Sequence, residues 1–188
     1  MNEAGPDHDI TRLIAAWRGG DADAREVLMQ RVYANVRAIA AQSLRRMPGA
    51  TLSATDLAHE ALMRMLGSDL DWADRRHFFH VAAQATRQVL VDAARRRLAD
   101  KRGGDAQHVD LDAALAVAAP ESDATLVRID AALHDLARSD ARRAHTIDLI
   151  YFGGFSRVEV AAALEVSEGT VDRDLRLARA WLKTALEA

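Results

Sequence analysis

Apolar residues recur every three or four positions along most of this chain, which is the spacing of one face of an α-helix. In the N-terminal half these stripes predict helices over residues 10–17, 21–46, 53–65 and 75–97. In the C-terminal half they predict helices over 126–136, 144–150, 156–164 and 167–183. No segment keeps the strict alternation of a strand, so the pattern predicts an all-α protein.

A change of composition divides the predicted helices into two groups. Gly103-Gly104 ends the fourth helix, and residues 105–123 then contain five acidic residues and no Lys or Arg. Such a segment is typical of a linker. The sequence therefore predicts two small helical domains, residues 9–102 and 123–186, joined by an acidic linker over 103–122.

The last two predicted helices have the pattern of a helix-turn-helix. Ser156 with Glu159 forms a capping-box pattern, and Ser167 with Thr170 marks a second helix start. The second helix carries an apolar stripe (Val171, Leu175, Ala178, Leu182) and separate cations (Arg173, Arg176, Arg179, Lys183). Two short helices joined by a tight turn, the second one basic, indicate DNA binding. An ordinary helical hairpin has the same stripes and stays open as the alternative.

Charge adds a second candidate DNA-binding region and one complication. Residues 87–102 hold six cations and two carboxylates, a local charge of +4, and three of the arginines (Arg95, Arg96, Arg97) are consecutive. Compensation of the helix dipole explains part of this cluster, and nucleic-acid contact is predicted for the rest.

The helix from Ser167 onward has three carboxylates (Glu168, Asp172, Asp174) against its four cations. Its charge of +1 is small for a phosphate-binding surface.

Composition narrows the class of protein further. The 188 residues carry a net charge of −3 and no cysteine, so a disulfide framework and a thiolate metal site are excluded. No apolar run reaches the length of a membrane span, and the N-terminus lacks the features of a signal peptide, so we expect a cytoplasmic protein without membrane insertion. The seven histidines are scattered, and no phosphate-binding loop or catalytic motif is present. We expect neither an enzyme nor a cofactor or metal.

Several motifs occur in an order that resembles a known family. They are residues 55–61 (TDLAHEA), 71–79 (DWADRRHFF), 91–97 (VDAARRR), 101–104 (KRGG) and 167–171 (SEGTV). In this order they resemble the sigma-70 superfamily, specifically the two-domain extracytoplasmic-function (ECF) sigma factors. The resemblance covers about Ile10 to Leu186. It implies a domain-2-like bundle, a domain-4-like helix-turn-helix bundle, and promoter-specific initiation with core RNA polymerase.

The resemblance also implies roles for individual residues. The core-binding residues would be Asp56, Glu60 and Arg64, which would contact the beta-prime subunit, with the beta subunit and promoter DNA as further partners. The minus-ten residues would be Asp71, Trp72, Arg75, Arg87, Arg95, Arg96 and Arg97, with the loop holding a flipped base. The minus-thirty-five residues would be Ser167, Thr170, Arg173 and Arg176. An anti-sigma factor is a further partner that the family suggests.

Three departures from the family pattern keep other functions open. Glu165 stands where the helix-turn-helix usually has Gly, so we expect an unfavourable backbone conformation or a different turn. Val81 and Ala83 replace the family's Trp and Tyr, and the nearby aromatics Trp72, Phe78 and Phe79 are expected in the core rather than as platforms for base stacking. Asp172 and Asp174 should repel phosphate. A free-standing helix-turn-helix regulator and a degenerate sigma-like protein-interaction module are therefore the alternatives.

Overall fold

The computed structural model describes residues 8–45, 52–67, 75–100 and 123–187. Within these segments every regular element is helical, which confirms the all-α prediction. The N-terminal helices are α1 (His8–Arg18), α2 (Ala22–Arg45), α3 (Ala54–Gly67) and α4 (Arg75–Asp100). The C-terminal helices are α6 (Asp123–Ser139), α7 (Ala141–Ile147), the π-helical turn η1 (Asp148–Phe152), α8 (Arg157–Leu164) and α9 (Glu168–Glu187). The predicted linker, residues 103–122, lies outside the described residues.

Side-chain caps start the N-terminal helices close to the predicted positions. The carboxylate of Asp21 accepts hydrogen bonds from the backbone N–H groups of Asp23 and Ala24, at 3.0 and 3.1 Å. The hydroxyl of Ser53 accepts from the N–H of Asp56 at 3.1 Å and donates to its carboxylate at 2.6 Å. These bonds satisfy amide groups that have no partner within the first turn. Ser53 is therefore the N-cap of α3.

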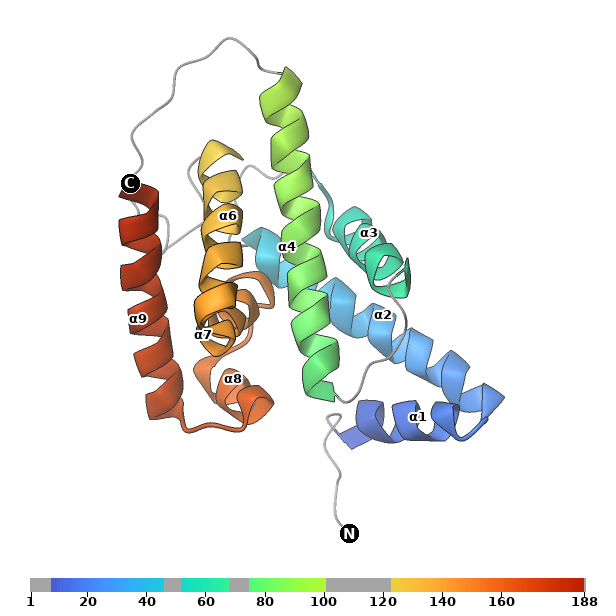
Figure 1. Cartoon of the computed structure of the whole chain (residues 1–188). Coiled ribbons are helices and arrows are strands. Elements are labelled where there is room, and N and C mark those ends of the chain that lie inside the picture. Colours follow the sequence, from blue (N-terminus) through green and yellow to red (C-terminus); the bar gives the residue numbers. More distant parts are fainter. Residues whose placement is uncertain (1–7, 46–51, 68–74, 101–122, 188) are drawn as a thin grey trace.

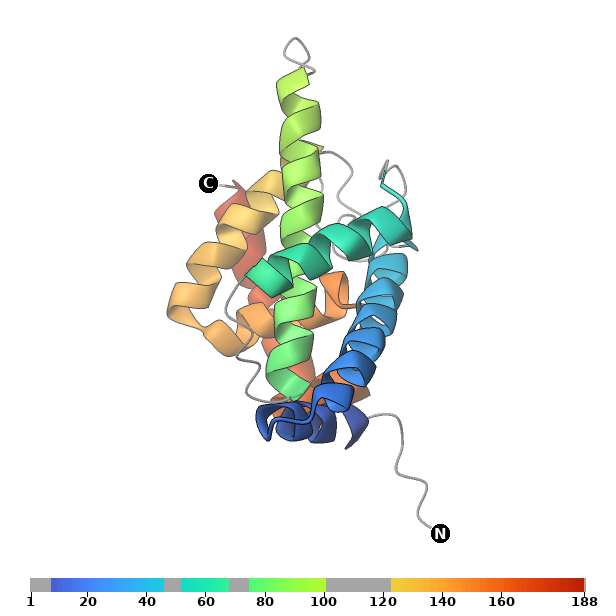
Figure 2. The same ribbon diagram turned by 90° about the vertical axis from the view of Figure 1, so that its right-hand side faces the viewer.

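Helix α4 is the centre of the structure. It runs between α2 and α3 on one side and α6 and η1 on the other, as two perpendicular views show (Figures 1 and 2). Its buried residues lie on almost every side of the helix: Phe78, Phe79, Ala82, Ala83, Ala85, Val89, Leu90, Val91 and Ala94. This burial places α4 in the core, although its first and last turns carry exposed polar residues. The expectation that both phenylalanines are core residues is confirmed.

The apolar interior continues from the N-terminal into the C-terminal helices. Buried side chains of α2, α3, α4, α6, α7, α8 and α9 form one cluster. Most apolar residues at helical spacing are buried. Val27 of α2 is an exception: the spacing predicts that it faces the core, but 44% of its surface is exposed. The two groups of helices therefore share a packed interface.

The turn between η1 and α8 contacts α2 so closely that it requires glycine. Gly154 has a φ of +75°, and a Cβ at this position would lie 2.4 Å from Cγ of Gln42. The side-chain amide of Gln42 donates to the carbonyl oxygen of Gly154. A larger residue at position 154 would clash with Gln42 and strain the backbone.

Candidate nucleic-acid interface

The helix-turn-helix is formed by α8 and α9, and both predicted caps are present. The hydroxyl of Ser156 accepts from the N–H of Glu159 at 3.3 Å, and the Glu159 carboxylate accepts from the N–H of Ser156 at 2.7 Å. This reciprocal pair is a complete capping box. At α9 the hydroxyl of Ser167 accepts from the N–H of Thr170 at 3.2 Å. Ser167 and Thr170 are thus occupied with each other at the start of α9.

The turn between these helices places Glu165 in the left-handed region, as the sequence led us to expect. Its φ and ψ are 54° and 44°. The N–H of Val166 donates to the oxygen of Ala161 at 3.0 Å, and the N–H of Glu165 to that of Ala162 at 3.4 Å. These are the two hydrogen bonds of a Schellman motif, which glycine usually completes. The carboxylate of Glu165 lies 2.8 Å from a guanidinium nitrogen of Arg76 on α4.

One face of α9 packs on the core and another presents cations. Val171, Leu175, Ala178 and Leu182 are buried, as the stripe predicts. Arg173 and Arg176 are exposed, and no hydrogen bond or ion pair involves either within the described part of the chain. Arg179 instead donates to the hydroxyl of Tyr151 at 2.8 Å. The two exposed arginines of α9, Arg173 and Arg176, thus lie in its first half.

The two aspartates of α9 do not face outward together. Asp174 has 1% of its surface exposed, and its carboxylate binds Arg142 of α7 at 2.6 and 3.2 Å. Asp172 is exposed and pairs with Arg157 of α8 at 2.8 Å. The expected phosphate repulsion is therefore wrong for Asp174, which lies on the buried face, and is compensated for Asp172 by a neighbouring cation.

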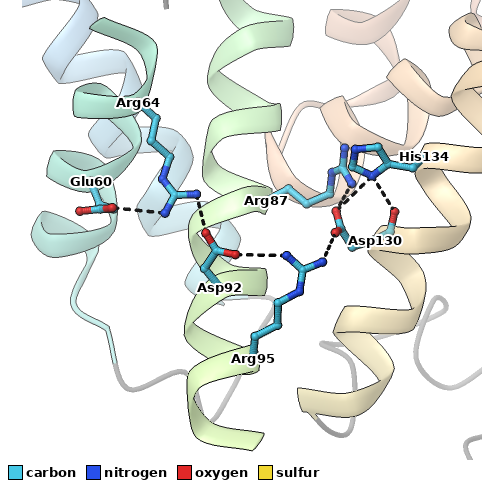
Figure 3. A network of polar contacts seen from close by, with 7 residues as sticks. All are labelled: Glu60, Arg64, Arg87, Asp92, Arg95, Asp130 and His134. Carbon is cyan, nitrogen blue, oxygen red and sulfur yellow. Dashed lines mark hydrogen bonds and ion pairs between the residues drawn. The ribbon is translucent and has the colours of Figure 1, made fainter. Parts of the chain in front are cut away.

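The residues predicted to bind core polymerase lie on the outer face of α3. Asp56 and Glu60 are exposed. Arg64 lies 3.2 Å from Glu60 and 2.9 Å from Asp92 of α4, which places it between the two helices (Figure 3). The structure brings all three residues to one face, with Arg64 turned towards α4.

The predicted minus-ten residues fall into two sets. Asp71 and Trp72 lie outside the described residues, and Arg75 is the first residue of α4. Further along α4, three of the four predicted arginines bind carboxylates of α6 and η1, whereas Arg96 is exposed.

These contacts all join the N-terminal to the C-terminal helices. Arg87 binds Asp130 of α6 and lies 2.8 Å from Asp148 of η1. Arg95 binds the same Asp130 at 3.0 Å (Figure 3). Asp130 thus accepts from two α4 arginines at once.

The pair nearest the end of α4 is bidentate. The guanidinium of Arg97 binds both carboxylate oxygens of Asp123, the first residue of α6, at 2.6 to 3.1 Å. The side-chain hydrogen bond to Asp123 raises the pKa of Arg97 above its usual value, so this group is charged at any physiological pH.

A sequence model of the ECF sigma factor family matches residues 7–188, nearly the whole chain. This chain belongs to the ECF sigma factor family. Its role is that of a sigma factor, a class of non-enzymatic proteins that act with RNA polymerase and promoter DNA. No curated protein and no solved structure matches the chain significantly. In the segments that the structure describes, no helix is long and apolar enough to cross a membrane, and no cluster of side chains is suited to a metal ion.

In this ECF sigma factor the contact between α4 and the C-terminal helices also contains groups that the sequence analysis missed. The ring of His80 on α4 contacts the ring of His145 on α7, with centroids 3.7 Å apart and planes tilted by 42°. Burial, followed by the charges of His145, His77 and Arg87, lowers the pKa of His80 to about 4. Both rings are therefore neutral in this arrangement at pH 7.

The buried carboxylate of η1 has the opposite shift. Burial raises the pKa of Asp148 to about 6, although Arg87 acts against this shift.

The burial of Arg87 could have been inferred from the sequence: it lies four residues after Ala83 and four before Val91, on a buried face of α4. Its partners, Asp130 and Asp148, could not be inferred in this way, because they come from distant segments of the chain.

Proposed function

We propose that this ECF sigma factor directs core RNA polymerase to promoters with two recognition elements and assists opening of the duplex. Residues 9–102 would bind core polymerase and the minus-ten element, residues 123–186 would bind the minus-thirty-five element, and residues 103–122 would link them. The exposed Arg173 and Arg176 on α9 support this proposal most strongly. They lie three residues apart on one face of a capped helix, close to its N-terminus, where a recognition helix contacts base edges.

The surface of α3 supports core binding. Asp56 and Glu60 lie one helical turn apart and are both exposed, so they can pair with a basic surface of the beta-prime subunit. Glu60 already has a cationic neighbour in Arg64, at 3.2 Å. An exposed pair of this kind contributes little and exchanges readily for an intermolecular one. Contacts with the beta subunit and with an anti-sigma factor stay predictions from the family.

Minus-ten recognition is proposed for Asp71, Trp72 and Arg75, with phosphate contacts from the α4 arginines. Holding a flipped base costs a few kcal/mol of unstacking, which contacts in the loop must offset. Arg96 is exposed and available for a phosphate in the arrangement described here.

The direct test is run-off transcription by purified bacterial core polymerase on a pool of genomic promoter fragments, with and without this protein. We expect discrete new start sites, and alignment of the upstream DNA would give both recognition elements.

A substitution tests the assignment of one residue. Arg176→Ala should weaken promoter-directed initiation by about 1–3 kcal/mol if the side chain contacts a base, with core binding unchanged. Arg138→Ala is the matched control, because Arg138 is an exposed arginine on α6 whose described partner is Asp135. No new starts, or equal effects of the two substitutions, would contradict the proposal.

One observation favours a second candidate, the free-standing DNA-binding regulator. Arg173 and Arg176 are exposed while three arginines of α4 are paired, so α9 is the more accessible DNA-binding surface here. This candidate predicts sequence-specific duplex binding without polymerase, which a gel shift measures. The degenerate interaction module loses its main support, because Asp174 is buried and Asp172 has a cationic partner.

A further inference from the structure

Asp172 lies on the exposed face of α9 that also carries Arg173 and Arg176. It precedes Arg173 by one position and Arg176 by four, so all three side chains project from the same exposed half of the helix. The opposite half is the buried stripe, and it contains Asp174 with 1% of its surface exposed. Of the two aspartates of α9, Asp172 is therefore the one that meets whatever Arg173 and Arg176 contact.

The carboxylate of Asp172 is held by an ion pair and by no hydrogen bond. Its Oδ1 lies 2.8 Å from Nε of Arg157 on α8, and the two side chains are 57% and 59% exposed. Among the residues that the structure describes, none donates a hydrogen bond to either carboxylate oxygen. An ion pair this exposed contributes little to stability. Asp172 therefore offers acceptors to a ligand on this face, and stability does not account for its presence there.

Arg157 compensates the charge of Asp172 on the side of α8. The first helix of a helix-turn-helix crosses the phosphate backbone, and Arg157 is the first residue of α8, the corresponding helix here. A guanidinium has several N–H donors in a fixed fork, so Arg157 can face both a carboxylate and a phosphate. The pair as a whole is neutral. Asp172 can therefore approach a major groove without adding a net negative charge to the surface.

A carboxylate in the major groove distinguishes the four bases by their hydrogen-bonding groups. Cytosine presents the amino group N4, which donates to a carboxylate. Guanine presents the acceptors N7 and O6, and thymine presents the acceptor O4, all of which repel a carboxylate. Adenine has an amino group beside the acceptor N7, so attraction and repulsion oppose each other. A carboxylate on a recognition helix thus favours cytosine.

We propose that Asp172 determines specificity within the minus-thirty-five element by accepting a hydrogen bond from a cytosine amine, and that Arg157 positions its carboxylate from α8. This inference rests on the proposed function and deepens it, since it names a base that is read beside Arg173 and Arg176. Rejection of the other bases contributes as much as attraction to cytosine, because discrimination is a difference between two affinities. The element should therefore contain one position at which cytosine is preferred.

Transcription from a promoter library measures this preference. Holoenzyme reconstituted from core polymerase and the full-length protein transcribes templates in which every position of the minus-thirty-five element is randomised, and the minus-ten element is taken from a promoter found by run-off transcription. We expect roughly a fivefold to tenfold preference for cytosine at one position. Initiation with equal use of the four bases at every position would overturn the inference and leave the proposed function intact. Initiation from no template at all would overturn both.

Substitutions of Asp172 show whether this residue is the cause of the preference. Asp172→Asn should move the preference at that position from cytosine to adenine, because an asparagine amide pairs with N6 and N7 of adenine. Asp172→Ala should reduce it to less than about twofold and leave the other positions unchanged. The matched control is Asp135→Asn on α6, since Asp135 is also 57% exposed and also pairs with an arginine, Arg138. It should alter no preference.

A merely structural role of Asp172 gives a different result. Loss of a structural contact would weaken initiation from all templates equally, without a change of preferred base, and this outcome would overturn the inference. Both side chains of the pair are more than half exposed, so we expect the variants to fold, which circular dichroism checks.

The positioning role of Arg157 is tested in the same library. Arg157→Ala should weaken the preference for cytosine at the position assigned to Asp172, because the carboxylate loses the cation that orients it. Arg157→Lys keeps a cation and should restore part of the preference. An unchanged preference in the alanine variant would overturn the positioning role.

Discussion

Replacement of Glu165 by glycine should stabilise the helix-turn-helix, although it removes a charged side chain that has a partner. Among the residues that the structure describes, Glu165 alone has a positive φ without being a glycine. A left-handed conformation costs a residue with a Cβ about 1–2 kcal/mol. Glycine avoids this strain but loses about 0.5–1 kcal/mol more backbone entropy on folding. The expected net gain in the free energy of unfolding is thus about 0.5–1 kcal/mol.

The glycine variant loses the ion pair between Glu165 and Arg76, so it should be compared with a variant that loses the same ion pair. Its side chains are 47% and 70% exposed, so the pair contributes little to stability. Glu165→Ala removes the same ion pair and keeps the strain, which makes it the matched control for Glu165→Gly. Glu165→Asn should lie between the two, because asparagine tolerates this region better than most residues.

Thermal unfolding followed by circular dichroism measures the difference. For a chain of this length a gain of 0.5–1 kcal/mol raises Tm by about 1–4 °C. We expect the glycine variant to unfold at the highest temperature of the series and the alanine variant at the lowest. A glycine variant no more stable than the alanine variant would refute the argument from backbone strain.

Three further predictions follow from other contacts. The double substitution Asp56→Ala with Glu60→Ala should weaken core binding roughly tenfold in a pull-down titration while the protein stays folded, since two exposed pairs contribute up to about 1 kcal/mol each; undiminished affinity would remove α3 from the core interface. Asp174→Ala should lower Tm by several degrees, because the substitution deletes a buried carboxylate with two hydrogen bonds, and an unaltered Tm would contradict that role. Because the folded protein favours the neutral form of His80, this group stabilises the fold above pH 6.5, and that stability is lost as the pH falls towards 4. Because the folded protein favours the protonated form of Asp148, this group stabilises the fold increasingly as the pH falls from 6 towards 3.8. These two shifts oppose each other, but burial also lowers the pKa of His145, and its loss of stability adds to that of His80, so Tm should fall as the pH drops through this range. NMR titration of the His80 ring should give a midpoint near 4, and a midpoint near 6.5 would show that the ring is not buried.

The sequence by itself determined most of the helices and several of their caps, because both depend on residues only a few positions apart. The helix predicted over 144–150 is an exception, since the structure has α7 there, followed by the π-helical turn η1. Apolar residues at intervals of three and four give the buried face of a helix wherever it forms. The capping box of Ser156 and Glu159 and the cap at Ser167 likewise use groups within one turn, so their bonds were predictable. The left-handed conformation of Glu165 was one of two outcomes expected from the family pattern, which usually has Gly at this position.

The sequence shows only in part which face of a helix carries a given charged residue. Asp174 lies three residues after Val171 and four before Ala178, so its place on the buried stripe of α9 could have been inferred. A count of charges along the helix missed this, because it treats all sides of a helix alike.

The partners of Arg87 and His80 were decided by the tertiary structure alone. Asp130 and Asp148 lie more than forty residues further along the chain, and His145 meets His80 only because the C-terminal helices pack against α4 through α6 and η1. Helix periodicity says that a side chain faces inward, but the packing of distant helices determines which group it meets there. A guanidinium suits a carboxylate and a phosphate equally well. The sequence could therefore assign cations to α4, whereas only the fold shows that three of them already hold carboxylates.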